Sequence, residues 1–229
     1  IYTSGTTGRP KGVKRIGVVG VTRKGNYYAF VKGARTLMVA PMYHSAPNRS
    51  ALSSFYTGGD IVLQPRFDAE QMLALIQQHR ITHMFVVPTM MVRLHKLPVE
   101  VRACYDVSSL EHVVHAGAPC PPDVKKALID WWGPVIYEYY GGTETGAVTY
   151  CTSAETLQKP GTVGCAVPDA TIRVVDDDGR DCPPNVTGEI YVRLHILPDF
   201  TYHGLPEERE KVEHEGLITC GDIGHLDED

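Results

Sequence analysis

The feature that most constrains the fold is an alternation of short apolar segments with amphipathic segments over residues 60–138. The stretches DIVLQPRF, THMFVV, LEHVVHAG and PVIYEYYGG have the length and apolar character of buried strands. Between them lie DAEQMLALIQQHR, PTMMVRLHKL and PPDVKKALIDWWG, whose apolar residues recur at helical spacing. This alternation predicts parallel βαβ units, and therefore an α/β fold with a parallel-rich sheet flanked by helices.

Local signals mark the ends of these segments. Asp68 followed by Gln71 is typical of a helix N-terminus, and the helix that follows is expected to bury one face. The residues of that face are Met72, Leu75, Ile76 and His79. Upstream, RTLMVAP predicts a further strand and MYHSAPNRS a loop. In a parallel sheet, ligands bind at the carboxyl ends of the strands, which here are followed by HAGAPC and YYGGTETG.

The pattern changes after about residue 159. GTVGCAV, ATIRVVDDDGRD, TGEIYVRL and GLITCGDIGHLDED are short β-rich segments separated by Gly, Pro and Asp, and VVDDDGRD carries a hairpin turn signal. We therefore expect two domains: an α/β portion over residues 1–159, and a small β-rich subdomain, a distorted barrel, over residues 160–229.

The charge balance argues against several partners. There are 27 Asp and Glu residues against 22 Lys and Arg, a formal net charge of -5, which does not favour a nucleic-acid surface or a polybasic membrane patch. No apolar stretch is long enough to span a bilayer, and no secretory signal pattern opens the chain. The six cysteines form no CxxC pair, which favours free thiols over a zinc site. We expect a cytoplasmic protein without a transmembrane segment.

The opening loop, YTSGTTGRPKGV at residues 2–13, is built of small, polar and flexible residues before a single lysine. Free backbone N–H groups, hydroxyl groups and a terminal cation suit an anion such as phosphate. The alternative is an ordinary surface loop, which clusters of glycine and threonine usually form. The loop is not a Walker A motif, because Gly5 and Gly8 are only three apart and Lys11 precedes Gly12.

This loop resembles the phosphate loop of the adenylate-forming superfamily, which includes acyl- and aryl-CoA synthetases, peptide-synthetase adenylation domains and luciferases. Further blocks follow in the order of that family: PMYHSAP, HAGAPCP, YYGGTETG, GEIYVR and TCGDIGHLDED. The resemblance covers essentially the whole chain. It indicates the central fragment of an acid–CoA ligase, without the N-terminal part and the mobile C-terminal domain of the family.

The resemblance implies a reaction in two steps. ATP activates a carboxylic acid as an acyl-adenylate with release of pyrophosphate, and the acyl group then forms a thioester with CoA. ATP and Mg²⁺ are the implied cofactors, CoA is the co-substrate, and the partner is a small-molecule carboxylic acid. In the family the C-terminal domain supplies a catalytic lysine, so the isolated fragment is expected to be inactive.

The resemblance also implies the nucleotide site. The residues implied for the phosphates and the adenosine are Thr3, Ser4, Gly5, Thr6, Thr7, Gly8, Lys11, Gly117, Ala118, Pro119, Tyr140, Gly141 and Asp222. Tyr140 would stack on the base and Asp222 would accept hydrogen bonds from the ribose hydroxyls, although Cys220 stands where the family usually has threonine. A packed strand-end aromatic and a turn aspartate are the structural alternatives for these two residues.

Three residues are implied for catalysis. Thr143 would contact the α-phosphate, Glu144 would hold Mg²⁺, and His44 would lie at the mouth of the acid pocket. A carboxylate after a strand suits a hard cation that bridges phosphates. We expect the basic side chains of Arg9, Lys14 and Arg15 to be a solvated edge.

The segment between residues 41 and 59 contains no Asp or Glu, which favours an acid without an α-amino group. Its small residues would leave room for an apolar tail, so a fatty, aryl or steroid-type acid is expected. Two alternatives remain open. One is an adenylation domain that loads the thiol of a carrier protein, and the other is a nucleotide-binding fragment without activity of its own.

Overall fold

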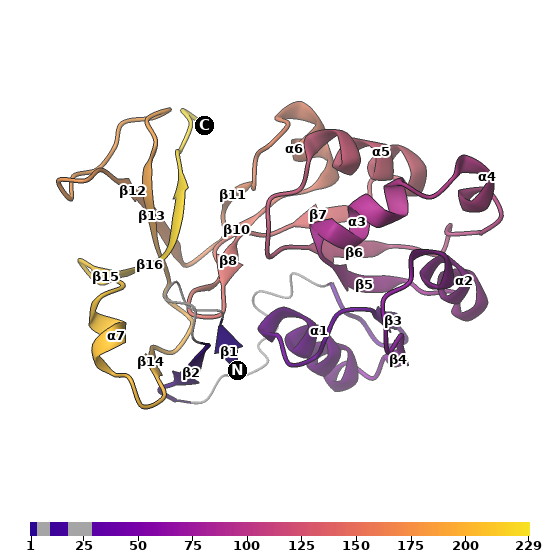
Figure 1. Ribbon diagram of the computed structural model, residues 1–229, viewed down its shortest axis with the longest axis horizontal. Coiled ribbons are helices and arrows are strands. Elements are labelled where there is room, and N and C mark those ends of the chain that lie inside the picture. Colours follow the sequence, from indigo (N-terminus) through magenta and orange to yellow (C-terminus); the bar gives the residue numbers. More distant parts are fainter. Residues whose placement is uncertain (4–9, 18–28) are drawn as a thin grey trace. The chain divides into compact units, whose positions relative to one another are not determined.

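A computed structural model describes residues 1–3, 10–17 and 29–229 of the chain (Figure 1). These residues form two compact units. The first comprises the described residues within 1–17, 141–149 and 166–229, and the second comprises residues 29–140 and 150–165. Within the described ranges, no helix has both the length and the apolar character needed to span a bilayer.

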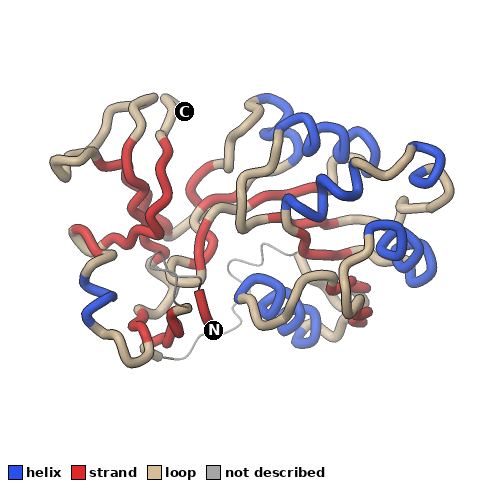
Figure 2. The backbone as a smooth tube through the Cα atoms, viewed as in Figure 1, coloured by secondary structure: helices blue, strands red, loops and turns tan. Residues whose placement is uncertain are grey.

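The second unit is built on a parallel sheet of five strands, drawn in red among the blue helices of Figure 2. Its strands are β3 (Arg35–Met38), β4 (Asp60–Leu63), β5 (His83–Val86), β6 (His112–His115) and β7 (Ile136–Glu138). Their order is β4-β3-β5-β6-β7, and every neighbouring pair is parallel. The predicted α/β fold is therefore confirmed.

Helices cover both faces of this sheet. The helices of the unit are α1 (Ser45–Tyr56), α2 (Ala69–His79), α3 (Pro88–His95), α4 (Val99–Arg102), α5 (Pro122–Trp132) and α6 (Ser153–Gln158). The chain runs from β3 to β4 in one direction across the sheet and from β4 onward in the other. Because parallel crossovers are right-handed, α1 lies on one face, and α2, α3 and α5 lie on the opposite face (Figure 1).

The core lies between the sheet and these helices. Every residue of β5 and of β6 is buried, as expected for central parallel strands covered on both faces. The fully buried apolar side chains of this core include Leu37, Met72, Ile76, Met84, Leu94 and Leu128. The sheet is therefore a rigid base for the loops that leave its carboxyl edge.

The local signals in the sequence had mixed outcomes. Asp68 caps α2 as predicted, because its side chain accepts a hydrogen bond of 2.8 Å from the N–H of Gln71. The strand expected over DIVLQPRF is not buried, however. It is the edge strand β4, in which Ile61 and Leu63 are exposed, because only one neighbouring strand covers it.

The expectation of a loop over MYHSAPNRS is wrong from Ser45 onward, where α1 begins. The buried positions of α1 are Pro47, Ser50, Ser53 and Ser54, so the helix carries no apolar periodicity that the sequence could reveal. Its inner face is instead held by polar contacts, of which the 2.8 Å hydrogen bond between the Thr36 and Ser54 hydroxyls is one.

The first unit is mainly antiparallel. One sheet has the order β1 (Tyr2–Thr3), β2 (Lys11–Arg15) and β14 (Phe200–Tyr202). A curled sheet has the order β12 (Ala170–Val175), β13 (Gly188–Leu194), β16 (Leu217–Gly224) and β15 (Glu213–His214). The unit also contains the hairpin of β8 (Gly141–Gly142) and β9 (Gly146–Ala147), and α7 (Glu207–Glu210). Elsewhere in the chain, β10 (Thr149–Tyr150) pairs with β11 (Cys165–Ala166).

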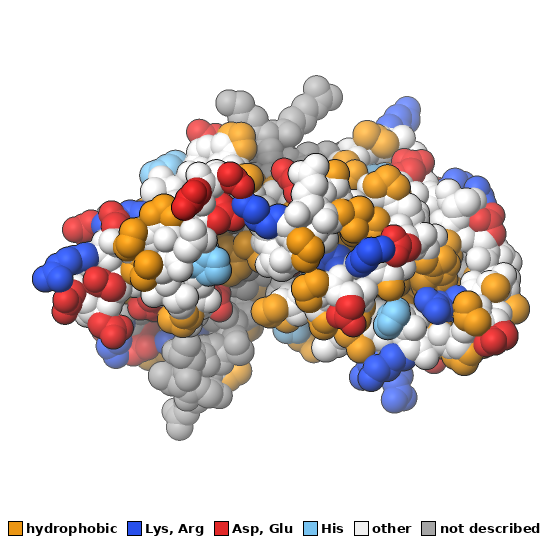
Figure 3. Space-filling model, turned by 90° about the horizontal axis from the view of Figure 1, so that it is seen from above, with side chains coloured by type: hydrophobic (Ala, Val, Ile, Leu, Met, Phe, Trp, Pro, Cys, Tyr) orange, Lys and Arg blue, Asp and Glu red, His pale blue; other side chains and the backbone are white. Residues whose placement is uncertain are grey.

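The compact units do not follow the order of the chain. Strand β2 pairs with β14, so the segment around Lys11 belongs with residues near 200 rather than with the parallel sheet. The division into domains 1–159 and 160–229 stays a prediction. In the view of Figure 3, acidic and basic side chains are intermixed on the described surface, which agrees with the formal net charge of -5.

Candidate functional site

The loop of residues 141–147 in the first unit is a tight hairpin that requires glycine. A Cβ atom on Gly141 would lie 1.8 Å from the carbonyl oxygen of Gly146, and one on Gly142 would lie 2.9 Å from Cys220 Sγ. Both distances are too short for a side chain. The N–H of Gly142 donates to Thr145 Oγ1 over 2.8 Å, which braces the turn. The sequence GGTE therefore gives this loop a fixed backbone for Thr143 and Glu144.

Glu144 is a buried carboxylate with one protein partner. Its side chain is only 8% exposed, and its Oε1 accepts a 3.0 Å hydrogen bond from the Tyr202 hydroxyl on β14. Burial, and then the charge of Glu144, raise the pKa of Tyr202, so the phenol remains a hydrogen-bond donor. The second oxygen, Oε2, accepts no hydrogen bond from the part of the chain that is described. Glu144 is therefore an oriented carboxylate whose second oxygen can bind a ligand.

The surroundings of Glu144 fit a magnesium ion that phosphates help to bind. Among the described residues, no group of three or more His, Cys, Asp or Glu side chains could hold a metal by itself. Mg²⁺ is usually bound through one or two carboxylates, several waters and the substrate phosphates, not by an all-protein cage. A single oriented carboxylate therefore suits Mg²⁺ delivered with ATP.

Lys11 is buried in an ion pair that the sequence did not reveal. Its Nζ lies 2.7 Å from Glu208 Oε2 on α7 and 5.1 Å from the centre of the Tyr202 ring. Hydrogen bonds from Lys11 and Lys211 lower the pKa of Glu208 to about 2. A phosphate bound by Lys11 would have to share the ammonium group with Glu208, so the phosphate role of Lys11 stays a prediction.

The two ends of the predicted phosphate loop lie side by side, because Thr3 on β1 pairs with Lys11 on β2. The loop residues between them that were predicted to bind phosphate, Ser4, Gly5, Thr6, Thr7 and Gly8, lie outside the described residues. The pairing shows that the loop is closed by a short antiparallel ladder at its base.

Cys220 and Asp222 lie in β16, after the buried residues 217–219 at its start. Asp222 is exposed, as a residue that accepts hydrogen bonds from a ribose must be. Burial, and then the charges of Glu144 and Asp222, raise the pKa of Cys220 to about 12. The thiol of Cys220 packs against Gly142.

The remaining predicted residues lie at the carboxyl edge of the parallel sheet in the second unit. His44 follows β3, the exposed residues Gly117, Ala118 and Pro119 follow β6, and Tyr140 follows β7. Strands β3 and β5 are neighbours whose connections run in opposite directions across the sheet. Ligands of open α/β sheets bind at such a switch point, and His44 follows one of its two strands.

The backbone also suits these loops to ligand contact. Gly117 has a φ of +88°, a conformation that favours glycine, and it turns the loop after β6 outward. His44 stands at the N-terminus of α1 with its ring exposed, and the ring centre lies 4.5 Å from that of Tyr43. This geometry by itself assigns no ligand, so the roles of these residues stay predictions.

Beneath this edge lies a buried charge cluster that the sequence analysis missed. Lys125 of α5 contacts Glu138 at the end of β7, and His115 Nε2 at the end of β6 lies 3.7 Å from the same carboxylate. Burial, and then the charge of Lys125, lower the pKa of His115 to about 3, so this histidine is neutral. The sequence offered one signal for this cluster, because His115 and Glu138 end two consecutive strands. These two residues are partners in the register of β6 and β7.

Arg15 also differs from expectation. Lys14 is exposed, as expected for a solvated edge, and Arg9 lies outside the described residues. Arg15, however, donates hydrogen bonds to the carbonyl oxygens of Thr143 and Pro198. The expectation that Arg15 is solvated is therefore wrong, because β2 is paired with β14 and directs this side chain to the loop of residues 141–147.

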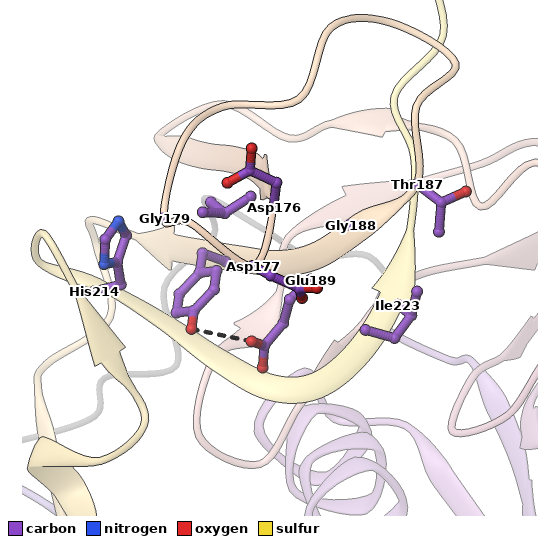
Figure 4. Close-up of a pocket in the computed structure, with 10 residues that line it drawn as sticks. Asp176, Asp177, Gly179, Thr187, Gly188, Glu189, His214 and Ile223 are labelled. Atoms are coloured by element: carbon purple, nitrogen blue, oxygen red, sulfur yellow. Dashed lines mark hydrogen bonds between the residues drawn. The ribbon is translucent and has the colours of Figure 1, made fainter.

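A separate pocket of about 470 Å³ lies beside β12, β13 and β16. Its lining includes Asp176, Asp177, Glu189, His214 and Ile223, labelled in Figure 4. The dashed line in Figure 4 is the 3.1 Å hydrogen bond that the Tyr191 hydroxyl donates to Glu189. None of the predicted site residues that the structure describes lines this pocket, so it is distinct from the predicted nucleotide site.

Comparison with known families decides the affiliation. The sequence profile of the AMP-binding enzyme family matches residues 1–197. The chain belongs to this family. The match includes the phosphate loop, His44, the loop after β6 and the GGTE loop, so the resemblance read from these motifs is confirmed.

Curated relatives of this chain include CoA ligases and luciferases. An indoleacetate–CoA ligase of Aromatoleum aromaticum is 31% identical over 231 residues, which cover 99% of this chain and 44% of the relative. A luciferin 4-monooxygenase of Luciola mingrelica is 33% identical over 238 residues, which cover 99% of this chain and 42% of the relative. The chain thus spans less than half the length of these relatives.

Solved structures show the same fold. The o-succinylbenzoate CoA synthetase of Bacillus subtilis, in complex with ATP and magnesium ion, is 27% identical with a TM-score of 0.80. The comparison covers 100% of this chain and 47% of that enzyme. The parallel sheet and the curled antiparallel sheet are therefore those of the large domain of adenylate-forming enzymes.

Proposed function

We propose that the complete protein activates a carboxylic acid with ATP as an acyl-adenylate and then transfers the acyl group to CoA. The observation that carries the proposal is the convergence of Thr143, Glu144, Lys11 and Asp222 in one compact unit. Three separate segments of the chain bring them there, and Glu144 is buried and oriented by a hydrogen bond. Because the relatives are more than twice as long as the shared stretch, the activity is proposed for the complete protein.

Three residues of this unit would each have a separate role in adenylation. Glu144 would hold Mg²⁺, which supplies charge neutralisation at the phosphates when bound. Thr143 would donate a hydrogen bond to the α-phosphate, where a carboxylate oxygen forms a bond to phosphorus and pyrophosphate leaves. Asp222 would accept hydrogen bonds from the vicinal ribose hydroxyls, for which a carboxylate with two acceptor oxygens is suited. Preorganised groups of this kind lower the barrier because they need no reorganisation during the reaction.

The proposed acid has an apolar tail and no α-ammonium group. The loop and helix from residue 41 to residue 59 contain no carboxylate that could pair with such an ammonium. His44 lies at the switch point of the sheet, where the carboxylate of the acid would approach. The indoleacetate named for one relative is an aryl acid of this kind, and supports an aryl or other apolar acid.

The thiol acceptor is proposed separately from the adenylation step. The relatives bear the names of both ligases and monooxygenases, so this fold by itself does not specify the second step. CoA is proposed because the ligases among the relatives are CoA ligases. We also propose a cytoplasmic location, where free thiols such as those of the six cysteines persist.

Exchange of labelled pyrophosphate into ATP tests the first step. The complete protein is assayed with Mg²⁺ and a panel of aryl, fatty, steroid and amino acids. Exchange that depends on an apolar acid supports the proposal, and exchange that depends only on amino acids contradicts the proposed substrate class. ATP binding without exchange for any acid would instead show a nucleotide-binding module without catalysis.

Thioester formation tests the second step. An active acid is incubated with ATP and CoA, and the acyl-CoA is quantified by chromatography. If exchange is robust while no acyl-CoA forms, the acceptor is a different thiol, such as that of a carrier protein.

A further inference from the structure

Arg15 connects the strand that follows the predicted phosphate loop to the GGTE loop. Its Nη2 donates a 2.6 Å hydrogen bond to the carbonyl oxygen of Thr143, and its Nη1 donates a 3.1 Å hydrogen bond to the carbonyl oxygen of Pro198. One planar guanidinium group thus holds two carbonyl groups that lie 55 residues apart in the chain (198 − 143). A guanidinium can do this because its donors are arranged in a rigid fork.

The position of this guanidinium is itself fixed. The backbone of Arg15 pairs with Phe200 in the ladder between β2 and β14. Its Cζ lies 5.6 Å from the centre of the Phe200 ring, over which Arg209 also lies at 4.8 Å. Phe200 is buried, and Arg209 is held by Asp199 at 3.1 Å. Arg15 therefore has little freedom to move relative to β14.

The carbonyl that Arg15 holds belongs to the peptide that joins Thr143 to Glu144. The side chains on the two sides of this peptide are those predicted to contact the α-phosphate and Mg²⁺. On the far side, the Glu144 carboxylate is oriented by Tyr202, which is also on β14. The loop is thus held through its backbone by Arg15 of β2 and through the Glu144 side chain by Tyr202 of β14, so both contacts determine where the carboxylate points.

We propose that Arg15 is a positioning residue that orients the Thr143–Glu144 peptide for binding of phosphate and metal. The proposal rests on the proposed adenylation function. The two hydrogen bonds described above go to backbone carbonyl groups, so this role requires no contact between Arg15 and ATP. A displacement of the carboxylate by about 1 Å is enough to lower turnover on the order of 100-fold in a preorganised site.

The test compares three variants of the complete protein in pyrophosphate exchange. Arg15→Met removes all donors and keeps an apolar stem of similar length. Arg15→Lys keeps the charge but cannot hold two carbonyl groups in the geometry of a fork. Lys14→Met is the matched control, because Lys14 is the adjacent residue on β2 and is exposed.

The expected result is a kcat lowered about 100-fold in Arg15→Met, and by less in Arg15→Lys. Both variants should need more Mg²⁺ for half-maximal exchange, with an unchanged KM for the acid. Lys14→Met should keep the wild-type kcat and Mg²⁺ dependence. A purely structural role for Arg15 would lower the melting temperature without shifting the Mg²⁺ dependence.

Wild-type kcat and Mg²⁺ dependence in Arg15→Met would overturn the proposal. If Arg15→Met does not fold, Arg15→Lys decides in the same way. A wild-type protein that shows no exchange with any acid contradicts the proposed function, not the role of Arg15. In that case the Mg²⁺ dependence of ATP binding is measured by calorimetry, and equal values for wild type and Arg15→Lys overturn the positioning role.

Discussion

Removing the lysine of the buried ion pair between Lys125 and Glu138 should destabilise the protein far more than removing the lysine of an exposed pair one residue away. The side chains of Lys125 and Glu138 are only 3% and 5% exposed. Lys126, the next residue of α5, pairs with Asp130 at 2.6 Å, and these side chains are 62% and 59% exposed. The two lysines share a helix and a residue type, so they form a matched comparison that differs in burial.

The magnitude follows from what each substitution leaves behind. Lys125→Met leaves the Glu138 carboxylate buried without its counter-charge, and breaking a buried pair in this way costs about 3–5 kcal/mol. Lys126→Met removes an exposed helical pair that is worth about 0.3–0.5 kcal/mol. The loss in the free energy of unfolding should therefore be about tenfold larger for Lys125→Met.

Two further measurements identify buried charge as the cause. Glu138→Gln added to Lys125→Met removes the stranded charge, so the double variant should be more stable than Lys125→Met. Burial already raises the pKa of Glu138, against the opposing effect of Lys125. Without Lys125 that rise is larger, and a raised pKa loses stabilisation as the pH increases through it. Lys125→Met should therefore cost more at pH 8 than at pH 5, about 1.4 kcal/mol for each pH unit within the titration range.

Urea unfolding of the complete protein, followed by circular dichroism at both pH values, measures these differences. The reasoning would be refuted if Lys125→Met and Lys126→Met destabilised the protein equally. It would also be refuted if the double variant were as unstable as Lys125→Met, since the loss would then come from packing and not from charge.

Three other predictions concern the site and its base. Glu144→Gln should lower the kcat of exchange by at least about 100-fold with a modest change in ATP binding, because an amide carries no charge for Mg²⁺; exchange near the wild-type rate would contradict the metal role. His44→Ala should change which acids are accepted in the panel and leave the affinity for ATP measured by calorimetry unchanged; the reverse pattern would assign His44 to the nucleotide. Because burial lowers the pKa of His115 to about 3, its stabilising contribution is complete above pH 6.5 and is lost as the pH falls from 6.5 toward 3. His115→Leu should abolish that part of the pH dependence of the free energy of unfolding measured in urea. An unchanged pH dependence would show that folding does not lower the pKa of His115.

The local backbone of the candidate site could be predicted from the sequence because short local motifs specify it, while the roles of its residues stay predictions. GGTE demands glycine where Gly141 and Gly142 approach other groups closely, and Asp68 and Gln71 suffice to start a helix. The parallel sheet followed from the alternation of apolar and amphipathic segments, each of which is readable within about ten to fifteen residues. Where side-chain type and spacing within one segment decide the structure, the sequence alone is enough.

The tertiary structure decided the contacts between distant segments. Lys11 is paired with Glu208, 197 residues away, and Arg15 with the carbonyl of Thr143, 128 residues away. No local pattern marks these partners, because they depend on the pairing of β2 with β14. For the same reason a surface arginine on β2 could not be told from one that orients a loop. Burial and pairing are properties of the folded chain. Only the structure could therefore distinguish the exposed Lys14 from Arg15, which donates a hydrogen bond to the carbonyl oxygen of Thr143.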